Sequence, residues 1–319
     1  GHFDVTGGGK ALAEAVEQLR TKVSKAIAAG ARIIVLSDRD CDEKRAPIPS
    51  LLMTAAVHHH LVRQKTRMEV GLVVESGDCR EVHHVALLLG YGAAAVNPYL
   101  AFESIEDLIR DGALTGVEPA QAVRNTVKAL GKGVLKVMSK MGISTIRSYR
   151  GAKIFEAVGV SEELLRNYFG TQTSSIGGIR LKEIADSYTH FHDDGFSIKD
   201  EDEILPNIGQ FSYRKDGERH AWNPETIALL QLATRQGNYN KFKEFTAAAD
   251  HKAEPIFLRD FFTFKKNPIP IDEVEPVEEI VKHFVTGAMS FGAISKEAHE
   301  ALALAMNRLG ARSNTGEGG

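Results

Sequence analysis

Residues 284–319 read FVTGAMSFGAISKEAHEALALAMNRLGARSNTGEGG, and this stretch has the pattern of one repeating unit of an α/β barrel. Phe284 and Val285 form a short strand-like run, which a loop of small residues follows. Residues 296–309 carry the apolar periodicity of an amphipathic helix. Because ligands of such barrels bind at the loops that follow the strands, this loop is a candidate site.

The loop itself is built from residues that suit a flat or phosphorylated ligand. Gly, Ala and Ser dominate it, so backbone N–H groups can approach a ligand closely. Met289 follows the strand-like run, and its thioether suits contact with an aromatic ring system. Ser290 and Ser295 add hydroxyl groups. We therefore expect Ala288, Met289, Ser290 and Ser295 to bind a ligand, with a glycine-rich surface turn as the alternative.

A single carboxylate, Glu317, lies in the second small-residue segment of this stretch. Asn314 and Thr315 precede it, and glycines flank it on both sides. Burial among such small groups raises the pKa of a carboxyl unless a partner is present. We therefore predict a catalytic role for Glu317 and substrate contacts for Asn314 and Thr315. A salt bridge of Glu317 with Arg312 or with a downstream lysine is the competing interpretation.

The first half of the chain alternates between helical and strand-like patterns. Helices are expected where apolar residues recur every three or four positions, and buried strands where short β-branched runs occur. The expected helices cover residues 12–29, 50–64, 80–89, 104–111, 119–141 and 151–158, and the expected strands cover residues 33–36, 70–74, 93–96 and 143–146. This rhythm predicts an α/β fold with a parallel sheet that is closed or nearly closed.

The alternation stops near Tyr188. Residues 190–203 are polar, and residues 252–276 are rich in Pro, Phe and charge, so we interpret this region as a long crossing segment. One helix is expected inside it, from Trp222 to about residue 236. The chain therefore divides into three parts, residues 1–205, 206–283 and 284–319.

Composition agrees with an enzyme and excludes several other classes. The chain has 319 residues and a net charge of −3, so it lacks the basic footprint of a nucleic-acid-binding protein. Apolar runs are too short to span a bilayer, and no leader-like segment opens the sequence. Cys41 and Cys79 do not make a disulfide framework. We expect a reducing compartment.

Two polar residues at strand ends are further candidates. Glu75 follows the expected strand 70–74, and Asn97 follows the expected strand 93–96. Both side chains are therefore expected above the barrel-like body, where ligands bind. The alternative for Asn97 is that it only caps the turn before Pro98.

The histidine clusters favour structural roles over metal binding. His58, His59 and His60 are adjacent on an expected helix, so their side chains point to different sides. His190 and His192 alternate as two ligands on one strand would, but a surface loop is favoured because two aspartates follow. We expect no metal site.

Two landmarks resemble the large subunit of the glutamate synthase family. Residues 284–319 resemble the opening of its FMN-binding synthase domain, a TIM-type barrel. Residues 73–103, VVESGDCREVHHVALLLGYGAAAVNPYLAFE, resemble its central domain, a degenerate barrel-like body. Residues 136–159 and 213–230 extend the likeness, so that it covers nearly all of the chain.

The resemblance implies a function that the residues alone do not give. Glutamate synthases release ammonia from glutamine in an amidotransferase domain and pass it through a tunnel to a flavin site. There 2-oxoglutarate is aminated and reduced by FMN to L-glutamate. Electrons arrive through iron–sulfur clusters from an electron-donating small subunit, using NADPH or NADH, or from ferredoxin. The enzyme is expected in the cytoplasm, or in a plastid if the source is a plant or an alga.

By this resemblance the 319 residues are only part of a catalyst. The amidotransferase nucleophile, the iron–sulfur ligands and most FMN contacts are expected outside them, so the isolated chain is expected to be inactive. Glu75 and Asn97 are then expected in the wall of the ammonia tunnel, and residues 288–290 with Ser295 on the flavin. The alternative is a stand-alone, non-catalytic scaffold or a small-ligand-binding barrel.

Overall fold

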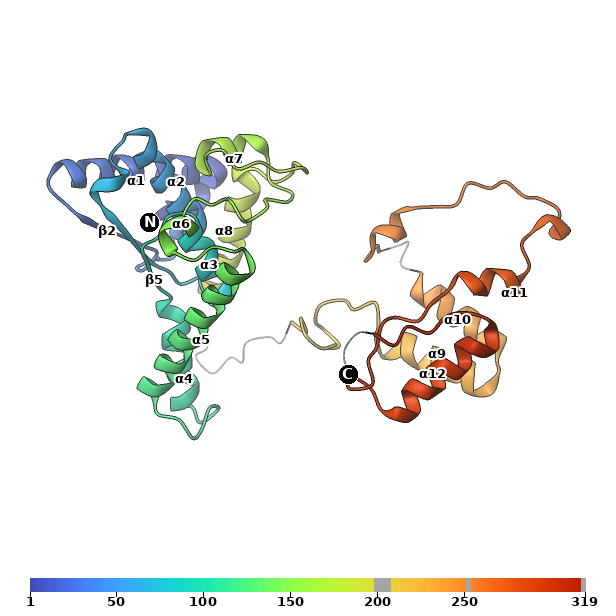
Figure 1. Cartoon of the computed structure of the whole chain (residues 1–319). Coiled ribbons are helices and arrows are strands. Elements are labelled where there is room, and N and C mark those ends of the chain that lie inside the picture. Colours follow the sequence, from blue (N-terminus) through green and yellow to red (C-terminus); the bar gives the residue numbers. More distant parts are fainter. Residues whose placement is uncertain (198–207, 251–253, 317–319) are drawn as a thin grey trace. The chain divides into compact units, whose positions relative to one another are not determined.

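The computed structural model describes residues 1–197, 208–250 and 254–316 of the chain (Figure 1). These residues form two compact units, unit 1 from Gly1 to Ile204 and unit 2 from Leu205 to Gly319.

A parallel sheet of three strands organises unit 1. The strands are β2 (Ile33–Ser37), β4 (Gly71–Glu75) and β5 (Ala95–Asn97), and they lie side by side in that order. Helix α2 (Ser50–Arg63) connects β2 with β4, and helix α3 (Val82–Gly90) connects β4 with β5. The expected α/β fold, its first three strands and the helices between them are therefore confirmed.

The helices of unit 1 cover one face of this sheet. Leu36 of β2 and Leu72 of β4 are buried with Leu61 of α2 in one core, to which Leu12 of α1 (Gly8–Ala28) also belongs. Val74 lies on the same face as Leu72 and packs with residues of α3. Burial of one such side chain contributes about 1.5–3 kcal/mol, so this layer is the main source of stability in unit 1.

The opposite face of the sheet is open. Ile33 and Val35 alternate with the buried residues of β2, and their exposed fractions are 68% and 57%. Parallel sheets are normally covered on both faces, so this exposure is unusual. In the described residues the sheet ends at β2 on one side and at β5 on the other.

Further elements complete unit 1. The short strands β1 (His2–Asp4) and β3 (Arg45–Pro47) pair antiparallel. Helix α8 (Leu181–Ser197) packs against α1. The remaining helices are α4 (Tyr99–Arg110), α5 (Pro119–Lys140), α6 (Ile146–Tyr149) and α7 (Glu162–Tyr168), with 3₁₀ turns η1 (Val5–Gly7) and η2 (Arg67–Glu69).

Two expected elements after α5 are wrong. Residues 143–146 do not form a strand; the Thr145 hydroxyl instead accepts a hydrogen bond from the Ser148 N–H and starts α6. Residues 151–158 do not form a helix, because Gly151 and Lys153 adopt φ values of +73° and +54°. Backbone in this left-handed region cannot continue a right-handed helix.

The polar segment after Tyr188 is also different from its expectation up to residue 197. It belongs to α8, in which His192 is buried and its Nε2 lies 2.8 Å from the Asp42 carbonyl oxygen, in the loop before β3. The helix therefore has a buried face that the run of polar residues concealed. The rest of the expected polar segment lies outside the described residues.

Unit 2 contains a helical hairpin and one strand–loop–helix segment. Helices α9 (Pro224–Gln236) and α10 (Tyr239–Ala249) pack together, and the Asn223 side chain caps α9. Helix α12 (Lys296–Leu309) has the expected bounds, with Ser295 as its N-cap and Gly310 as its C-cap. The other elements are α11 (Val277–Ile280), η3 (Leu258–Phe261), η4 (Ile271–Glu273) and η5 (Val281–His283).

The segments on either side of α12 lie next to each other. Val285 and Arg312 form a parallel bridge, in which the Thr286 N–H donates to the Arg312 carbonyl at 3.1 Å. The Arg312 N–H in turn donates to the Phe284 carbonyl at 3.2 Å. This strand–loop–helix–strand connection agrees with the unit expected from the sequence.

Candidate functional site

The ends of the three parallel strands bring polar side chains together. Ser37, Glu75 and Asn97 are paired in register at the carboxyl edge of the sheet. The Ser37 hydroxyl donates to Glu75 Oε2 at 2.7 Å, and the Asn97 Nδ2 donates to Glu75 Oε1 at 3.4 Å. All three side chains lie on the open face of the sheet, opposite the helices. Ser37 and Glu75 are two residues after Val35 and Val73, whose side chains lie on that face, and Asn97 is paired with Glu75.

An arginine from the loop after β2 completes this row. Arg39 Nε lies 2.9 Å from Glu75 Oε1, and Arg39 NH1 lies 3.1 Å from Glu103 Oε1. Its guanidinium also stacks over the Tyr99 ring, 3.7 Å from the centroid. The Ser37 hydroxyl and Arg39 lower the pKa of Glu75, so this carboxylate stays ionised at neutral pH and accepts hydrogen bonds.

Both candidates of the sequence analysis at this edge are therefore in contact. The Asn97 side chain hydrogen-bonds to Glu75, and α4 begins at Tyr99 without a side-chain cap. Sequence reasoning missed Ser37, Arg39 and Glu103. The first two were visible as polar residues after the expected strand 33–36, because adjacent parallel strands end at the same edge.

A buried acidic network lies behind this row, and sequence reasoning missed it too. Asp38 is only 4% exposed; its Oδ2 accepts from the Gly77 N–H at 2.7 Å, whereas its Oδ1 has no hydrogen-bond partner. The Asp78 carboxylate accepts from the Ser50 N–H at 3.1 Å and from the Tyr188 hydroxyl at 2.8 Å. Burial raises the pKa of Asp38, and the charge of Asp78 adds to the effect.

The loop expected to bind a ligand lies in unit 2. Met289 and Ser290 are half-buried, whereas Ala288 and Ser295 are exposed. The Ser295 hydroxyl accepts a hydrogen bond from the Ala298 N–H at 3.2 Å, so it caps α12. The structure thus gives Ser295 a role in the helix start that the sequence analysis had not assigned.

The second small-residue segment lies against this loop. The Asn314 N–H donates to Thr286 Oγ1 at 3.0 Å, and the Gly316 N–H donates to Asn314 Oδ1 at 3.0 Å. Thr315 is exposed. Glu317, the predicted catalytic residue, lies outside the described residues.

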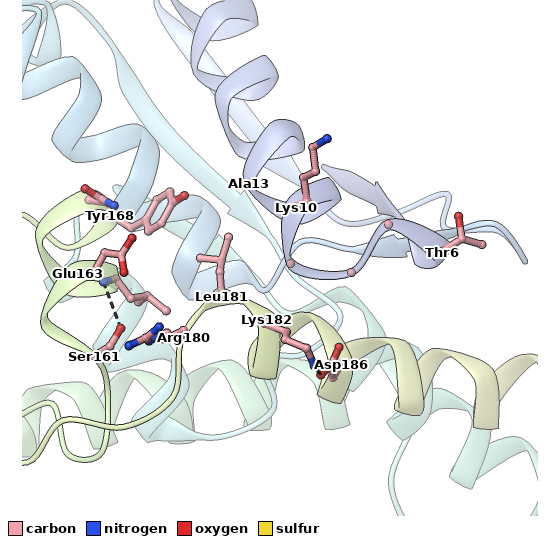
Figure 2. Close-up of a pocket in the computed structure, with 15 residues that line it drawn as sticks. Thr6, Lys10, Ala13, Ser161, Glu163, Tyr168, Arg180, Leu181, Lys182 and Asp186 are labelled. Atoms are coloured by element: carbon pink, nitrogen blue, oxygen red, sulfur yellow. Dashed lines mark hydrogen bonds and ion pairs between the residues drawn. The ribbon is translucent and has the colours of Figure 1, made fainter.

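A cavity in unit 1 lies elsewhere, between the start of α1, α7 and the start of α8 (Figure 2). Its volume is about 640 Å³. Lys182 and Asp186 on its wall form an ion pair of 2.5 Å, and Lys10 lies 3.9 Å from Glu14. The Ser161 hydroxyl caps α7. These pairings serve the helices themselves, and the sheet edge remains the better candidate for chemistry.

The clustered histidines serve the packing of α2. His58 Nδ1 accepts a hydrogen bond from Arg67 Nε at 2.9 Å. Burial lowers the pKa of both His58 and His59 to about 4, so these rings are neutral at pH 7. In the described ranges no three His, Cys, Asp or Glu side chains gather as metal ligands would. The helices described here also include none with the length and apolar character that a membrane crossing needs.

Two protein families match the chain in succession. Residues 1–161 match the family described as "Glutamate synthase central domain", and residues 220–319 match the family described as "Conserved region in glutamate synthase". The first match contains the sheet edge around Glu75, and the second contains the paired loops around Thr286.

Curated relatives match along nearly the whole chain. The chain is 48% identical over 310 residues to the glutamate synthase [NADPH] large chain of Bacillus subtilis, which covers 97% of this chain and 20% of that protein. It is 45% identical over 313 residues to the glutamate synthase [NADH] of Schizosaccharomyces pombe, covering 96% and 15%. It is 40% identical over 330 residues to the ferredoxin-dependent glutamate synthase of Pyropia yezoensis, covering 99% and 21%.

The chain therefore spans between 15% and 21% of the length of these relatives. Both family matches and the matches to these relatives point to the same family. On these grounds the chain belongs to the glutamate synthase family.

Proposed function

We propose that these residues are a segment of the large subunit of a glutamate synthase, which makes L-glutamate from 2-oxoglutarate and glutamine-derived ammonia. The segment supplies the interdomain scaffold, part of the ammonia tunnel wall and the first flavin and substrate loops. The observation that carries the proposal is the parallel pairing of Val285 with Arg312, which joins two small-residue loops at the ligand end of a barrel unit. Membership of the family supports it.

We also propose that unit 1 belongs to a degenerate barrel-like domain and that residues 284–319 open a TIM-type barrel, with residues 206–283 connecting them. Sequential strand order, with α2 and α3 on one face, is the winding of a (β/α) barrel. The open face of β2, β4 and β5 would then be the barrel interior. This orientation places Ser37, Glu75 and Asn97 at the rim of that interior.

The cofactor proposed for the intact subunit is FMN, contacted by residues 288–290. These residues offer backbone amides and the Met289 thioether, which fit an isoalloxazine ring and its polar edge. In the full-length enzyme, Met289→Lys should reduce flavin content or flavin reduction at least tenfold while the melting temperature changes little. Wild-type flavin reduction in that variant would remove Met289 from the site.

The 319-residue chain alone should not retain FMN, because a barrel site needs loops from several strands. Gel filtration after incubation with FMN, followed by an absorption spectrum of the protein peak, measures this. A stoichiometric flavin peak would contradict the segment proposal and favour a stand-alone ligand-binding barrel, which is the alternative function.

Ammonia transit is the role proposed for Glu75 and Asn97. An ammonia path needs a polar wall that does not donate a proton to ammonia, and a neutral amide satisfies this condition. The Asn97 side chain hydrogen-bonds to Glu75, and the negative charge of Glu75 is balanced by Arg39. The strand ends therefore present polar groups without an unpaired carboxylate.

The test of this role separates two ammonia sources. In the full-length enzyme, Asn97→Leu should lower glutamine-dependent glutamate synthesis about tenfold but spare synthesis from added ammonium. Asn125→Leu, on the exposed surface of α5, is the matched control and should affect neither reaction. Equal loss with both nitrogen sources would mean that Asn97 only supports the turn before α4.

Glu317 is proposed to act at the tunnel mouth, where it takes a proton from ammonium and couples substrate binding to glutamine hydrolysis. Glu317→Gln keeps the shape of the side chain and removes its charge. The full-length variant should hydrolyse glutamine without a matching yield of glutamate, and its flavin content should stay unchanged. A wild-type ratio of the two products would exclude this role.

The remaining partners are proposed from the relatives. These include NADPH-dependent, NADH-dependent and ferredoxin-dependent enzymes, so the electron donor is a pyridine-nucleotide-linked small subunit or domain, or ferredoxin. Iron–sulfur ligands are placed outside residues 1–319. We propose the cytoplasm as the location, or a plastid, since one relative is chloroplastic.

A further inference from the structure

We propose that Thr286 is a positioning residue of the synthase site, whose hydroxyl fastens residues 313–316 (the second loop) to residues 287–290 (the first loop). The inference rests on the proposed function and adds to it a role for Thr286. It follows from how the pairing of the two loops changes along their length.

The pairing begins as an ordinary parallel ladder and then changes character at Thr286. The Arg312 N–H donates to the Phe284 carbonyl at 3.2 Å, and the Thr286 N–H donates to the Arg312 carbonyl at 3.1 Å. The next contact is different, because the Asn314 N–H donates to the Thr286 side chain, at 3.0 Å from Oγ1. A side-chain hydroxyl therefore takes the place that a backbone carbonyl has in a ladder.

The second loop is closed on itself by the next residue pair. Asn314 Oδ1 accepts a hydrogen bond from the Gly316 N–H at 3.0 Å, which fixes the turn through Thr315. Gly316 has a φ of +72°, a conformation that favours glycine. The Thr286 hydroxyl therefore accepts a hydrogen bond from the Asn314 N–H, at the start of a turn that is already closed by its own hydrogen bond.

The two loops are in close contact beyond this point. A Cβ added to Gly316 would lie 3.2 Å from the Ser290 nitrogen and 3.5 Å from the Met289 carbonyl carbon. Any side chain at position 316 would therefore push the loops apart. The separation of the two loops therefore depends on two contacts. One is the hydrogen bond between the Thr286 hydroxyl and the Asn314 N–H, and the other is the close approach of Gly316 to the backbone of Met289 and Ser290.

The functional consequence is preorganisation. The first loop carries the residues proposed for the flavin, Met289 and Ser290, and the second carries those proposed for the substrate. A reaction between flavin and substrate loses rate steeply when the two are misplaced by about 1 Å. We therefore assign Thr286 to orientation of substrate against flavin, without contact to either.

The experiment compares two substitutions in the full-length enzyme with ammonium as the nitrogen source. Thr286→Val keeps the β-branched shape and removes the acceptor, whereas Thr286→Ser keeps the acceptor and removes the methyl group. We expect Thr286→Val to lower kcat about tenfold with a smaller change in KM for 2-oxoglutarate. The kcat of Thr286→Ser should stay within about twofold of wild type. FMN content and melting temperature should be unchanged in both. Thr246→Val, on exposed α10, is the control for the exchange itself.

A second measurement does not depend on the proposed function. In the 319-residue chain, the Asn314 amide should exchange its hydrogen about tenfold faster in Thr286→Val than in wild type or Thr286→Ser. Unchanged exchange would overturn the hydroxyl contact itself. Faster exchange with unchanged kcat would overturn the positioning role. A loss of kcat in Thr286→Ser as large as that in Thr286→Val would overturn the assignment to the hydroxyl, because the serine variant keeps this acceptor. A full-length wild-type subunit that makes no glutamate would instead contradict the proposed function, while the exchange result would still report on the contact.

Discussion

Unit 1 and unit 2 differ in how they use their apolar residues. In unit 1, side chains from α1, α2, β2 and β4 share one core, and Leu12, Leu61 and Leu72 are fully buried. In unit 2, aromatic side chains such as Phe211 and Phe264 are almost wholly exposed, and the described buried residues are few and small or polar. The comparison teaches that well-formed helices do not make a core unless their apolar faces find complementary surfaces.

The sharpest test of this comparison is hydrogen exchange along the intact chain. Amides of β4 and α2 should exchange only through global unfolding, because they lie in the core of unit 1. Amides of α9, α10 and α12 should exchange about a thousandfold faster, since fewer buried contacts oppose their local opening. Mass spectrometry of peptides from both units measures the difference. Similar protection of the amides in both units would contradict the proposed difference between them.

A pair of truncations tests where apolar burial contributes to stability. Leu72→Ala removes a fully buried side chain of β4 and should lower the free energy of unfolding by about 2–5 kcal/mol. Phe264→Ala removes a larger side chain that is 100% exposed, and should change it by less than about 0.5 kcal/mol. Denaturant titrations followed by circular dichroism give both values. A large effect of Phe264→Ala would mean that this ring is buried in solution.

Local capping should matter in unit 2, where little else holds the helices. Asn223 Oδ1 accepts hydrogen bonds from the N–H groups of Glu225 and Thr226 at 3.0 and 3.1 Å. Asn223→Ala should therefore destabilise the α9–α10 hairpin by about 0.5–2 kcal/mol. Asn240→Ala, at an exposed position of α10, is the control. The measurement is exchange of α9 amides, and equal effects of the two variants would remove the cap from the explanation.

The smallest expected effect concerns the buried carboxyl of unit 1 and has a pH signature. Because burial raises the pKa of Asp38, protonation favours the folded state. The stabilising contribution is present below the unfolded pKa of about 3.9 and is lost as pH rises through the higher folded pKa. Asp38→Asn should thus gain stability relative to wild type between pH 3 and pH 7. A difference in unfolding midpoint that is constant over this range would show that Asp38 has no raised pKa.

Local patterns predicted the elements whose signals lie within a few residues. The β-branched run at 33–36 and the periodicity of residues 12–29 placed β2 and α1 within a few positions of their observed bounds. The apolar periodicity of residues 296–309 predicted α12, whose ends the structure caps with Ser295 and Gly310. The same logic failed at residues 143–158, where the Thr145 cap and positive φ values at Gly151 and Lys153 override the apolar pattern.

The candidate sites divide in the same way. The positions of Glu75 and Asn97 at the carboxyl ends of their strands were predicted from the local sequence, because each residue directly follows a strand-like run. Their contact was not predictable, since the hydrogen bond between them joins residues 22 positions apart through the register of β4 with β5. The roles proposed for Glu75, Asn97, Met289, Ser290 and Glu317 remain predictions, and the variants of Asn97, Met289 and Glu317 test three of them.

By itself, the sequence determined the family, the α/β alternation and the strand ends where polar residues gather, because these depend on residue type and short spacing. Only the tertiary structure decided that Arg39 bridges Glu75 and Glu103, the latter 64 residues away, and that Thr286 receives the Asn314 amide from across α12. Such contacts depend on strand register and helix direction, which arise from packing of the whole unit. The pattern of any one segment therefore does not contain them.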